Sequence, residues 1–157
     1  AYQLASNEKY PSWGWWIVNG ATTLYENWPI NAQSDISMNH IMFGEIGAWM
    51  YKALGGIKPD PSSPGFKNIL LHPYFVKDLK EFKASHQCLY GVIKSEWRRK
   101  GKKIIYNVTI PPNTTATVTL NIEPKQKVYL DKVKQDTQES ATLEKMLQAG
   151  TYTFEIK

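Results

Sequence analysis

The chain has 157 residues, of which 42% are hydrophobic and 13% aromatic, and it carries a formal net charge of +5. This apolar content is ample for a packed core and excludes wholesale disorder. The single cysteine, Cys88, cannot form an internal disulfide, and no Cys/His cluster offers a zinc site. No apolar run reaches the roughly 18 residues of a membrane span. We therefore expect a globular chain with no metal or other cofactor and no membrane partner.

Charge is unevenly distributed along the chain. Residues 1–60 carry three lysines and five acids, a net of −2, whereas residues 61–157 carry sixteen basic residues and nine acids, a net of +7. Such asymmetry suggests two parts with different roles. The opening stretch, AYQLASNEKY, lacks an initiating Met and the pattern of a signal peptide, so we expect it to lie inside a longer protein. The compartment stays open.

Aromatic residues gather around one acid near the N-terminus. Residues 10–28 read YPSWGWWIVNGATTLYENW and contain four of the six tryptophans: Trp13, Trp15, Trp16 and Trp28. Glu26 is the acid in this stretch. Aromatic faces around an isolated carboxylate suit a sugar-cleaving pocket, because the rings cover the apolar faces of a pyranose while the acid moves a proton. The alternative is an aromatic core with Glu26 at its rim, which composition alone favours.

The next segment has the pattern of a buried helix. Ser37 can cap a helix that starts at Met38, with His40 in its first turn, and Gly55-Gly56 ends it. Between these limits the sequence is apolar on nearly every side, which is typical of a helix packed among other helices. Because this chain holds few helices, we expect the segment to belong to a larger helical domain.

Beyond residue 57 the period changes. Residues 58–68, KPDPSSPGFKN, have the composition of a linker, and the alternation that follows has a period of two. Short strands joined by tight turns predict an antiparallel sandwich. The expected strands are 67–74, 82–85, 89–98, 104–110, 115–122, 128–130 and 152–156.

A basic run, KSEWRRKGKK (94–103), has two interpretations. It could be a nucleic-acid patch with Trp97 as a stacking platform. Its position at a hairpin instead favours charges that keep a turn and an edge strand soluble, so we expect no nucleic-acid partner. His72 and His86 lack a second ligand at metal-binding spacing and are interpreted as ordinary polar positions.

Glu26 and His40 remain as the candidate pair for chemistry. They are fourteen residues apart, and a loop over residues 29–37 can fold one toward the other. The spacing alone does not prove that they meet.

At these residues the sequence resembles the bacterial α-L-rhamnosidases that hydrolyse with inversion, glycoside hydrolase family 78. The resemblance lies in YPSWG (10–14), GATTLYENW (20–28), MNHIMFGEIGAWMYKALGGI (38–57), PDPSSPGFKNILLHP (59–73) and VIKSEWRRKGKKIIYNVTIPPNTTATVTL (92–120). It implies an α+β chain: residues 1–57 as the closing helices of an (α/α)6 barrel, 58–68 as a linker and 69–157 as a C-terminal β-sandwich.

The resemblance also implies roles for individual residues. Glu26 matches the glutamate that acts as general base, deprotonating the water that attacks the anomeric carbon of rhamnose. His40 would hydrogen-bond a sugar hydroxyl, and Trp28 and Trp13 are candidate pocket walls. Tyr25 stands where many relatives have Trp, and the loop between Trp28 and His40 is shorter than the family pattern, which bears on substrate fit.

The family's general acid lies upstream of the matched segments, so the resemblance implies that this chain alone is inactive. The implied partners are a rhamnose-containing glycan or glycoside and the remainder of the barrel, or a second copy of the chain in a homo-oligomer. Two other roles stay open for the sandwich: a carbohydrate-binding module or a purely structural domain. The alternating core pattern favours the structural role, since no cluster of aromatic residues forms a platform there.

Overall fold

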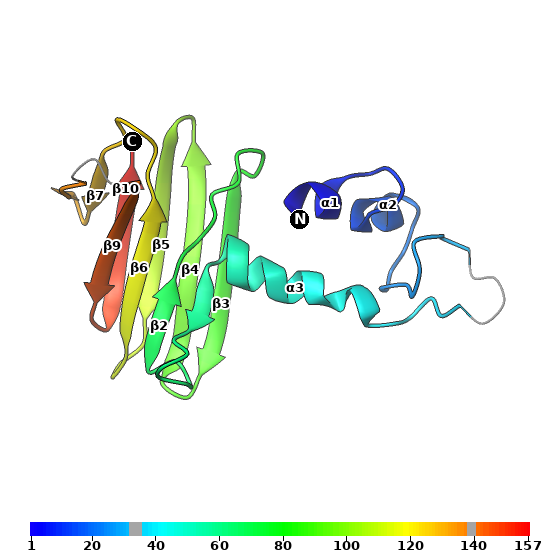
Figure 1. Ribbon diagram of the computed structural model, residues 1–157, viewed down its shortest axis with the longest axis horizontal. Coiled ribbons are helices and arrows are strands. Elements are labelled where there is room, and N and C mark those ends of the chain that lie inside the picture. The colour runs from blue at the N-terminus through cyan, green and yellow to red at the C-terminus, as the bar shows by residue number, and fades with distance from the viewer. Residues whose placement is uncertain (32–35, 138–140) are drawn as a thin grey trace. The chain divides into compact units, whose positions relative to one another are not determined.

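The computed structural model describes residues 1–31, 36–137 and 141–157. The chain divides into two compact units, Ala1–Trp49 and Met50–Lys157. The described residues of the first unit form the helices α1 (Tyr2–Ser6), α2 (Trp13–Val18) and α3 (Glu45–Trp49) and the 3-10 turn η1 (Met42–Gly44). The second unit begins with a π-helical turn, η2 (Met50–Leu54), and continues as strands (Figure 1).

The helix expected from Met38 begins four residues later, at Met42, so that expectation was wrong at its start. Ser37 does not cap it: the Ser37 hydroxyl accepts from the Asn39 backbone N–H at 3.2 Å and donates to the Asn39 carbonyl at 3.1 Å. His40 instead precedes the helix, and its ring Nδ1 accepts the Met42 backbone N–H at 3.0 Å. A side chain that accepts a hydrogen bond two residues ahead satisfies a free donor at the helix start, as an N-cap does.

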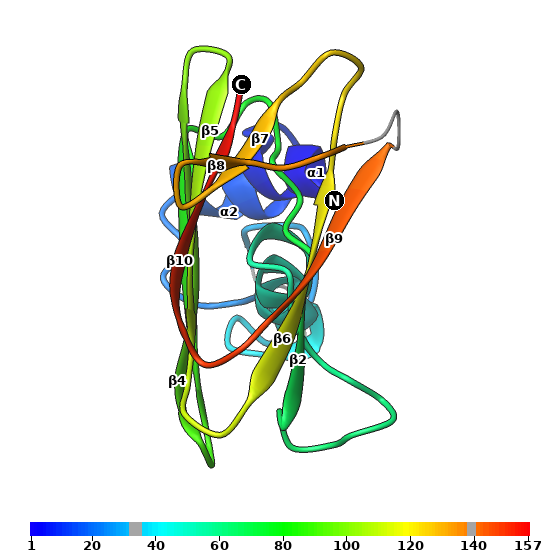
Figure 2. The same cartoon turned by 90° about the vertical axis from the view of Figure 1, so that its left-hand side faces the viewer.

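Unit 2 is a sandwich of two sheets, which Figure 2 shows as separate layers. The first sheet has the order β1-β2-β6-β9, with β1 (Ile57–Pro59), β2 (Asn68–Leu71), β6 (Thr115–Asn121) and β9 (Thr142–Leu147). The second has the order β3-β4-β5-β10-β7-β8, with β3 (Glu81–Cys88), β4 (Gly91–Lys100), β5 (Lys103–Ile110), β10 (Gly150–Ile156), β7 (Val128–Leu130) and β8 (Val133–Lys134). The few helices followed by a β-sandwich confirm the expected fold class.

Sheet pairing differs from the expectation at three strands and one pair. Strands β1, β8 and β9 were not expected, and β2 pairs with β6 in parallel, whereas the other described pairs are antiparallel. The segment expected as a linker begins in β1 and ends at the start of β2, two paired strands of the first sheet in which Pro59 lies opposite Ile69. Its turns therefore close a loop between two paired strands.

The core follows the predicted alternation. Side chains at every second position of β5 and β6 are buried, and they face the interior of the sandwich. The buried positions are Ile104, Tyr106, Val108 and Ile110 on β5, and Ala116, Val118 and Leu120 on β6.

Strand β4 is not the edge strand that the basic run suggested. It pairs with β3 on one side and β5 on the other, and β3 is the edge strand on that side of the sheet. Trp97 points into the core with 2% of its surface exposed, so it offers no stacking platform. Lys94, Glu96, Arg98 and Lys100 lie on the outward positions of β4, whereas Arg99 shares the inward side with Trp97 and is half-buried, because alternate residues of a strand face opposite sides.

Two side chains of the sandwich bind the end of η2. The Trp97 indole nitrogen donates to the Leu54 carbonyl at 2.9 Å, and the Ser95 hydroxyl donates to the Gly55 carbonyl at 2.5 Å. The Ser95 oxygen also lies 3.0 Å from the Tyr106 hydroxyl, and burial raises the pKa of Tyr106 above its ordinary range. These bonds satisfy carbonyls that a helix end leaves free, and they place η2 in the same compact unit as the strands.

Candidate active site

The YPSWG segment builds the turn that starts α2. The buried Ser12 hydroxyl accepts the Trp15 backbone N–H at 2.9 Å and donates to the carbonyls of Lys9 and Asn7. Gly14 is required because a Cβ there would lie 2.3 Å from the Asn7 carbonyl oxygen. The serine and glycine of this motif thus have structural roles.

The following segment ends α2 and leads to the acid. Gly20, with a φ of +84°, donates its N–H to the Ile17 carbonyl at 3.0 Å, and Ala21 donates to the Trp16 carbonyl at 2.9 Å. This pair of bonds is a Schellman motif, which needs a residue that tolerates a left-handed backbone. The Gly-Ala of GATTLYENW therefore turns the chain from the helix toward Glu26.

The backbone of Ser37 binds both the main chain and the side chain of Glu26. Its N–H donates to the Ser37 carbonyl at 3.0 Å, and its Oε2 accepts the Ser37 N–H at 2.8 Å. The carboxylate is half-buried. A hydrogen bond from a backbone N–H to a carboxylate is charge-assisted and orients the acid.

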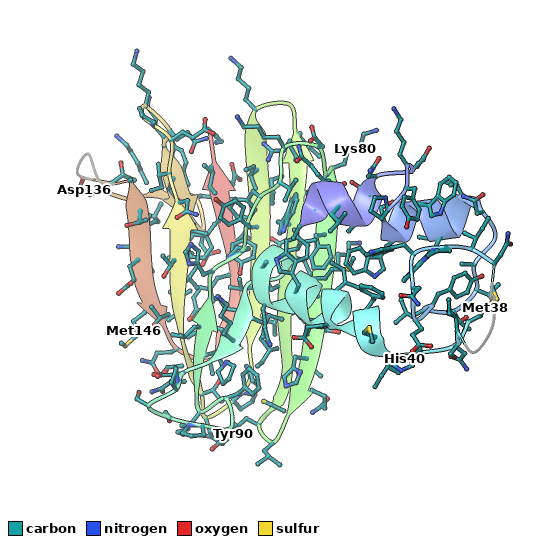
Figure 3. The ribbon with its side chains drawn as sticks, turned by 45° about the vertical axis from the view of Figure 1, so that its right-hand side comes forward. Met38, His40, Lys80, Tyr90, Asp136 and Met146 are labelled. Carbon is teal, nitrogen blue, oxygen red and sulfur yellow. The ribbon has the colours of Figure 1, made fainter. Side chains whose placement is uncertain are left out.

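His40 lies on the segment that pairs with the Glu26 segment. Its backbone N–H donates to the Leu24 carbonyl at 2.8 Å, and the nearby Thr23 hydroxyl donates to the Met38 carbonyl at 2.5 Å. Because the His40 Nδ1 accepts the Met42 N–H, the proton of the neutral ring sits on Nε2. The side chain of His40 is labelled in Figure 3. These bonds bring residues 23–26 and 37–40 side by side.

Trp13 and Trp28 belong to an aromatic cluster. Trp13 contacts Trp28 edge-to-face with ring centroids 5.1 Å apart, and Trp16, at 2% exposure, contacts Trp28 at 4.7 Å. Phe43 and Tyr25 complete the cluster, Phe43 against Trp28 at 4.4 Å and Tyr25 against Trp16 at 5.5 Å. Trp13 and Trp28 are half-buried, so each packs in the cluster and keeps part of its surface exposed.

Two further hydrogen bonds fix the indoles. The Trp16 Nε1 donates to the Trp28 carbonyl at 2.9 Å, and the Trp13 Nε1 donates to the Phe43 carbonyl at 3.2 Å. The aromatic-core interpretation therefore describes Trp16, and Trp13 and Trp28, the residues expected as pocket walls, pack in the same cluster.

A recess that the sequence did not indicate lies next to the cluster segment. It has a volume of about 290 Å3 and is lined by Tyr10, Trp15, Pro29, Ile30, Asn31 and Ile36. Tyr10 and Trp15 meet edge-to-face at 6.2 Å, and the buried Trp15 Nε1 has no hydrogen-bond partner among the described residues. Trp15, the second Trp of WGWW, was the signal in the sequence, but the sequence pattern indicated no role for it different from that of Trp13 and Trp16.

Within the described ranges, no group of three His, Cys, Asp or Glu residues could hold a metal ion. No helix in those ranges is long and apolar enough to cross a membrane. His72 and His86 have ordinary contacts: the His72 Nε2 lies 3.3 Å from the Asn121 Oδ1, and the His86 ring lies against Phe66 at 4.5 Å.

Comparison with known families assigns both units. Residues 1–54 match the family model described as bacterial alpha-L-rhamnosidase 6 hairpin glycosidase domain. Residues 56–135 match the model described as bacterial alpha-L-rhamnosidase C-terminal domain. The two matches meet between residues 54 and 56, at the end of η2.

Curated relatives agree. An alpha-L-rhamnosidase of Formosa agariphila is 32% identical over 99% of this chain, which covers 18% of that protein. An alpha-L-rhamnosidase of Streptomyces avermitilis is 29% identical over 82% of the chain, which covers 13% of that protein. The chain thus spans less than a fifth of the length of these relatives.

Solved structures give the same result. The alpha-L-rhamnosidase of Dictyoglumus thermophilum superposes with a TM-score of 0.89 at 26% identity, over 99% of this chain and 18% of that one. The alpha-L-rhamnosidase of Streptomyces avermitilis complexed with L-rhamnose superposes with a TM-score of 0.85 at 26% identity, over 99% of this chain and 16% of that one. The chain belongs to the bacterial alpha-L-rhamnosidase family.

Proposed function

We propose that this chain supplies the closing part of the catalytic domain and the C-terminal sandwich of an inverting α-L-rhamnosidase, with Glu26 as general base. The observation that carries the proposal is the position of Glu26: it lies in the GATTLYENW segment, beside an aromatic cluster, with its carboxylate oriented by the Ser37 N–H. A fixed carboxylate with a partly exposed surface can accept a proton from a bound water.

The reaction needs a second carboxyl group. In an inverting glycosidase one acid protonates the leaving-group oxygen, while a base about 6.5–9.5 Å away activates water on the opposite face of the sugar. One carboxylate cannot do both at once. We therefore propose that the general acid comes from a part of the catalytic domain outside this chain, and that the chain alone does not hydrolyse rhamnosides.

His40 and the tryptophans have supporting roles in this proposal. The Nε2–H of His40 donates to a hydroxyl of the rhamnose, since its Nδ1 is already used by Met42. The partly exposed edges of Trp13 and Trp28 form an apolar wall for the sugar ring.

Unit 1 has an exposed apolar surface, which supports the proposal that another structural element covers it. Ile17, Val18, Ile41 and Met42 are exposed, and Ile41 reaches 85%. Apolar side chains gathered on one small unit mark a surface that another element covers. We propose that the remaining helices of the (α/α)6 barrel cover this surface in the whole protein. In the isolated chain, a second copy is the alternative partner.

The test is an assay with an aryl α-L-rhamnoside. We expect no rhamnose release from the 157-residue chain, and release from the full-length protein, with β-L-rhamnose as the first product seen by NMR. Release by the chain at the full-length rate would refute the proposal that the general acid lies outside this chain. Initial formation of α-L-rhamnose would refute inversion.

A further inference from the structure

A recess lies at one end of the β-sandwich, wholly within unit 2. Its volume is about 720 Å3, and it is bordered by the turn between β4 and β5, the segment that follows β2, the segment that follows β6, and the C-terminal end of β10. The β4–β5 turn and the C-terminus lie at the same end of the sandwich in Figure 1. We name this cavity the terminal recess. Its size is that of a site for a small ligand or one or two sugar units.

Positive charge predominates around the terminal recess. One acid, Glu123, lines it together with five basic residues: Lys77, Arg99, Lys102, Lys125 and Lys157. The ammonium of Lys157 is paired with Glu155 at 3.0 Å and lies over the Tyr129 ring at 4.5 Å. The other basic residues leave a surplus of positive charge, and a concave basic surface attracts an anion.

Arg99 is fixed at the wall of the terminal recess. Its Nη2 donates to the Phe75 carbonyl at 2.9 Å and to the Val76 carbonyl at 3.4 Å, and its backbone N–H donates to the Lys80 carbonyl at 2.7 Å. The buried Nε has no acceptor among the described residues. Backbone carbonyls, and no carboxylate of the described residues, therefore hold the guanidinium of Arg99. These bonds do not neutralise its charge.

Tyr74 gives the terminal recess an aromatic side. Its backbone N–H donates to the Ala53 carbonyl at 2.8 Å, which anchors the residue, while 63% of its surface is exposed. Its ring makes no aromatic contact within the described residues. Ile104 and Ile156 supply apolar floor. An exposed aromatic ring next to apolar floor can cover the C–H face of a sugar.

Lys125 stands where the backbone favours glycine. The turn Glu123–Gln126 is closed by the Gln126 N–H to the Glu123 carbonyl at 3.1 Å, and Lys125 has a φ of +71°. A side chain in this left-handed region costs backbone energy relative to glycine. Lys125 nevertheless occupies this position and lines the terminal recess.

We propose that the terminal recess binds a carboxylate-bearing sugar unit of a glycan. The lysines and Arg99 attract the carboxylate, and Tyr74 covers the ring. That this unit belongs to the rhamnose-containing substrate rests on the proposed function; the binding itself does not. A nucleic acid fits less well, because Tyr74 is a single exposed ring and single-strand binders stack successive bases along a basic groove.

The experiment is calorimetric titration of the 157-residue chain with tri-galacturonic acid. Its methyl ester serves as the neutral control of the same shape. We expect saturable binding of the acid that weakens with salt, and at least fivefold weaker binding of the ester. Equal binding of acid and ester, or no binding, would overturn the proposal.

Two variants and a matched control locate the site. Lys125→Gly removes a charge and relaxes the turn, so it should weaken binding roughly two- to fivefold without loss of stability. Tyr74→Ala should also weaken the binding of tri-galacturonic acid. The control Lys94→Gln removes the same charge from an exposed position of β4 outside the terminal recess and should leave affinity unchanged. If Lys94→Gln and Lys125→Gly weakened binding equally, net charge alone would explain the affinity, and the terminal recess would not be the binding site.

Competing ligands decide the class. If inorganic sulfate binds as tightly as tri-galacturonic acid, the site takes an adventitious ion only. If a single-stranded oligonucleotide binds more tightly than the acid at the same residues, the ligand of the site is a nucleic acid and not a sugar. Either result overturns the proposal. Binding of the acid without rhamnosidase activity in the full-length protein would refute the proposed function and leave this inference standing, whereas activity without binding would do the reverse.

Discussion

The carboxylate of Glu26 accepts a 2.8 Å hydrogen bond from the backbone N–H of Ser37, and the Glu26 N–H in turn donates to the Ser37 carbonyl at 3.0 Å. This reciprocal pair fixes both the backbone and the side chain of Glu26. The bond uses Oε2, and the mechanism proposed above requires Oε1 to accept the proton of a water. The two bonds orient a carboxylate that can accept a proton, as the proposed mechanism requires.

Glu26→Gln should abolish most activity of the full-length protein without unfolding it. The glutamine carbonyl can still accept the Ser37 N–H, but it cannot take a proton from water. We expect kcat to fall by about 10²- to 10⁴-fold, with an unchanged unfolding midpoint. Glu8→Gln, at an exposed acid of the same unit, is the control and should retain activity. A Glu26→Gln enzyme with near-normal kcat would show that another group is the base.

Two substitutions at His40 separate its structural and binding roles. Asparagine can still accept the Met42 N–H, as N-cap residues do, but it lacks the Nε2–H donor. His40→Asn should therefore preserve stability and raise KM roughly fivefold, which corresponds to a lost hydrogen bond of about 1 kcal/mol. His40→Ala should raise KM and also lower the unfolding free energy by about 1 kcal/mol. An unchanged KM in His40→Asn would leave His40 with a structural role only.

The sequence predicted part of this site. The GATTLYENW segment and its resemblance to a family drew attention to Glu26, and the spacing to His40 allowed the two residues to approach but did not predict that they do. The bonds that hold the two segments run through the backbone of Ser37 and Leu24, which no side-chain pattern reveals. The same is true of the recess at Trp15, because its lining comes from residues far apart in the sequence, Tyr10, Trp15, residues 29–31 and Ile36, whose proximity sequence periodicity does not specify.

Ser95→Ala should destabilise unit 2 more than Tyr106→Phe does. The Ser95 hydroxyl bridges the Gly55 carbonyl and the Tyr106 hydroxyl, so its removal leaves two buried polar groups unpaired and should cost about 1–3 kcal/mol. Tyr106→Phe leaves the bond from Ser95 to Gly55 intact and should cost about 0.5–1.5 kcal/mol. Urea unfolding of both variants measures the difference. The reverse order would mean that the tyrosine hydroxyl, and not the Gly55 carbonyl, is the important partner.

Strands with clear alternation were predictable, and those without it were not. β5 has buried residues at every second position and was expected almost to the residue. β1 contains Lys58 and Pro59, which have the composition of a linker, and it is a strand because it pairs with β2. The parallel pairing of β2 and β6 depends on which strands meet in space, which local patterns do not specify. η2 was expected as part of a helix, but the bond from the Gly55 N–H to the Met50 carbonyl at 3.0 Å widens its last turn.

Gly56→Ala should be far more damaging than Gly65→Ala. Both glycines have a left-handed backbone, with φ of +69° and +85°. A Cβ at Gly56 would also lie 2.3 Å from the backbone of His72 and Pro73, whereas a Cβ at Gly65 meets nothing within 4 Å. We expect Gly65→Ala to cost about 1–2 kcal/mol from the backbone alone, and Gly56→Ala at least about 2 kcal/mol more. Equal costs in urea unfolding would show that the loop after β2 moves to accept the methyl group.

Glu155 predicts how the stability of the sandwich depends on acid. Its hydrogen bond to Lys103, 2.7 Å long, and a second to Lys157, 3.0 Å long, lower the pKa of Glu155 from 4.5 to about 2. Because the folded-state pKa is depressed, the stabilising contribution is present above the unfolded pKa of 4.5 and is lost as the pH falls toward 2. Glu155→Gln should therefore be less stable than the parent protein at neutral pH, and the difference should shrink between pH 4.5 and 2.

The measurement is the unfolding free energy of both proteins in urea across this pH range. High salt should reduce the difference at neutral pH, since exposed ion pairs are screened. Glu144→Gln, at an exposed position of β9, controls for the loss of one negative charge and should leave the parent's acid dependence in place. A constant gap between Glu155→Gln and the parent down to pH 2 would mean that packing of the side chain, and not its ion pairs with Lys103 and Lys157, is what Glu155 contributes.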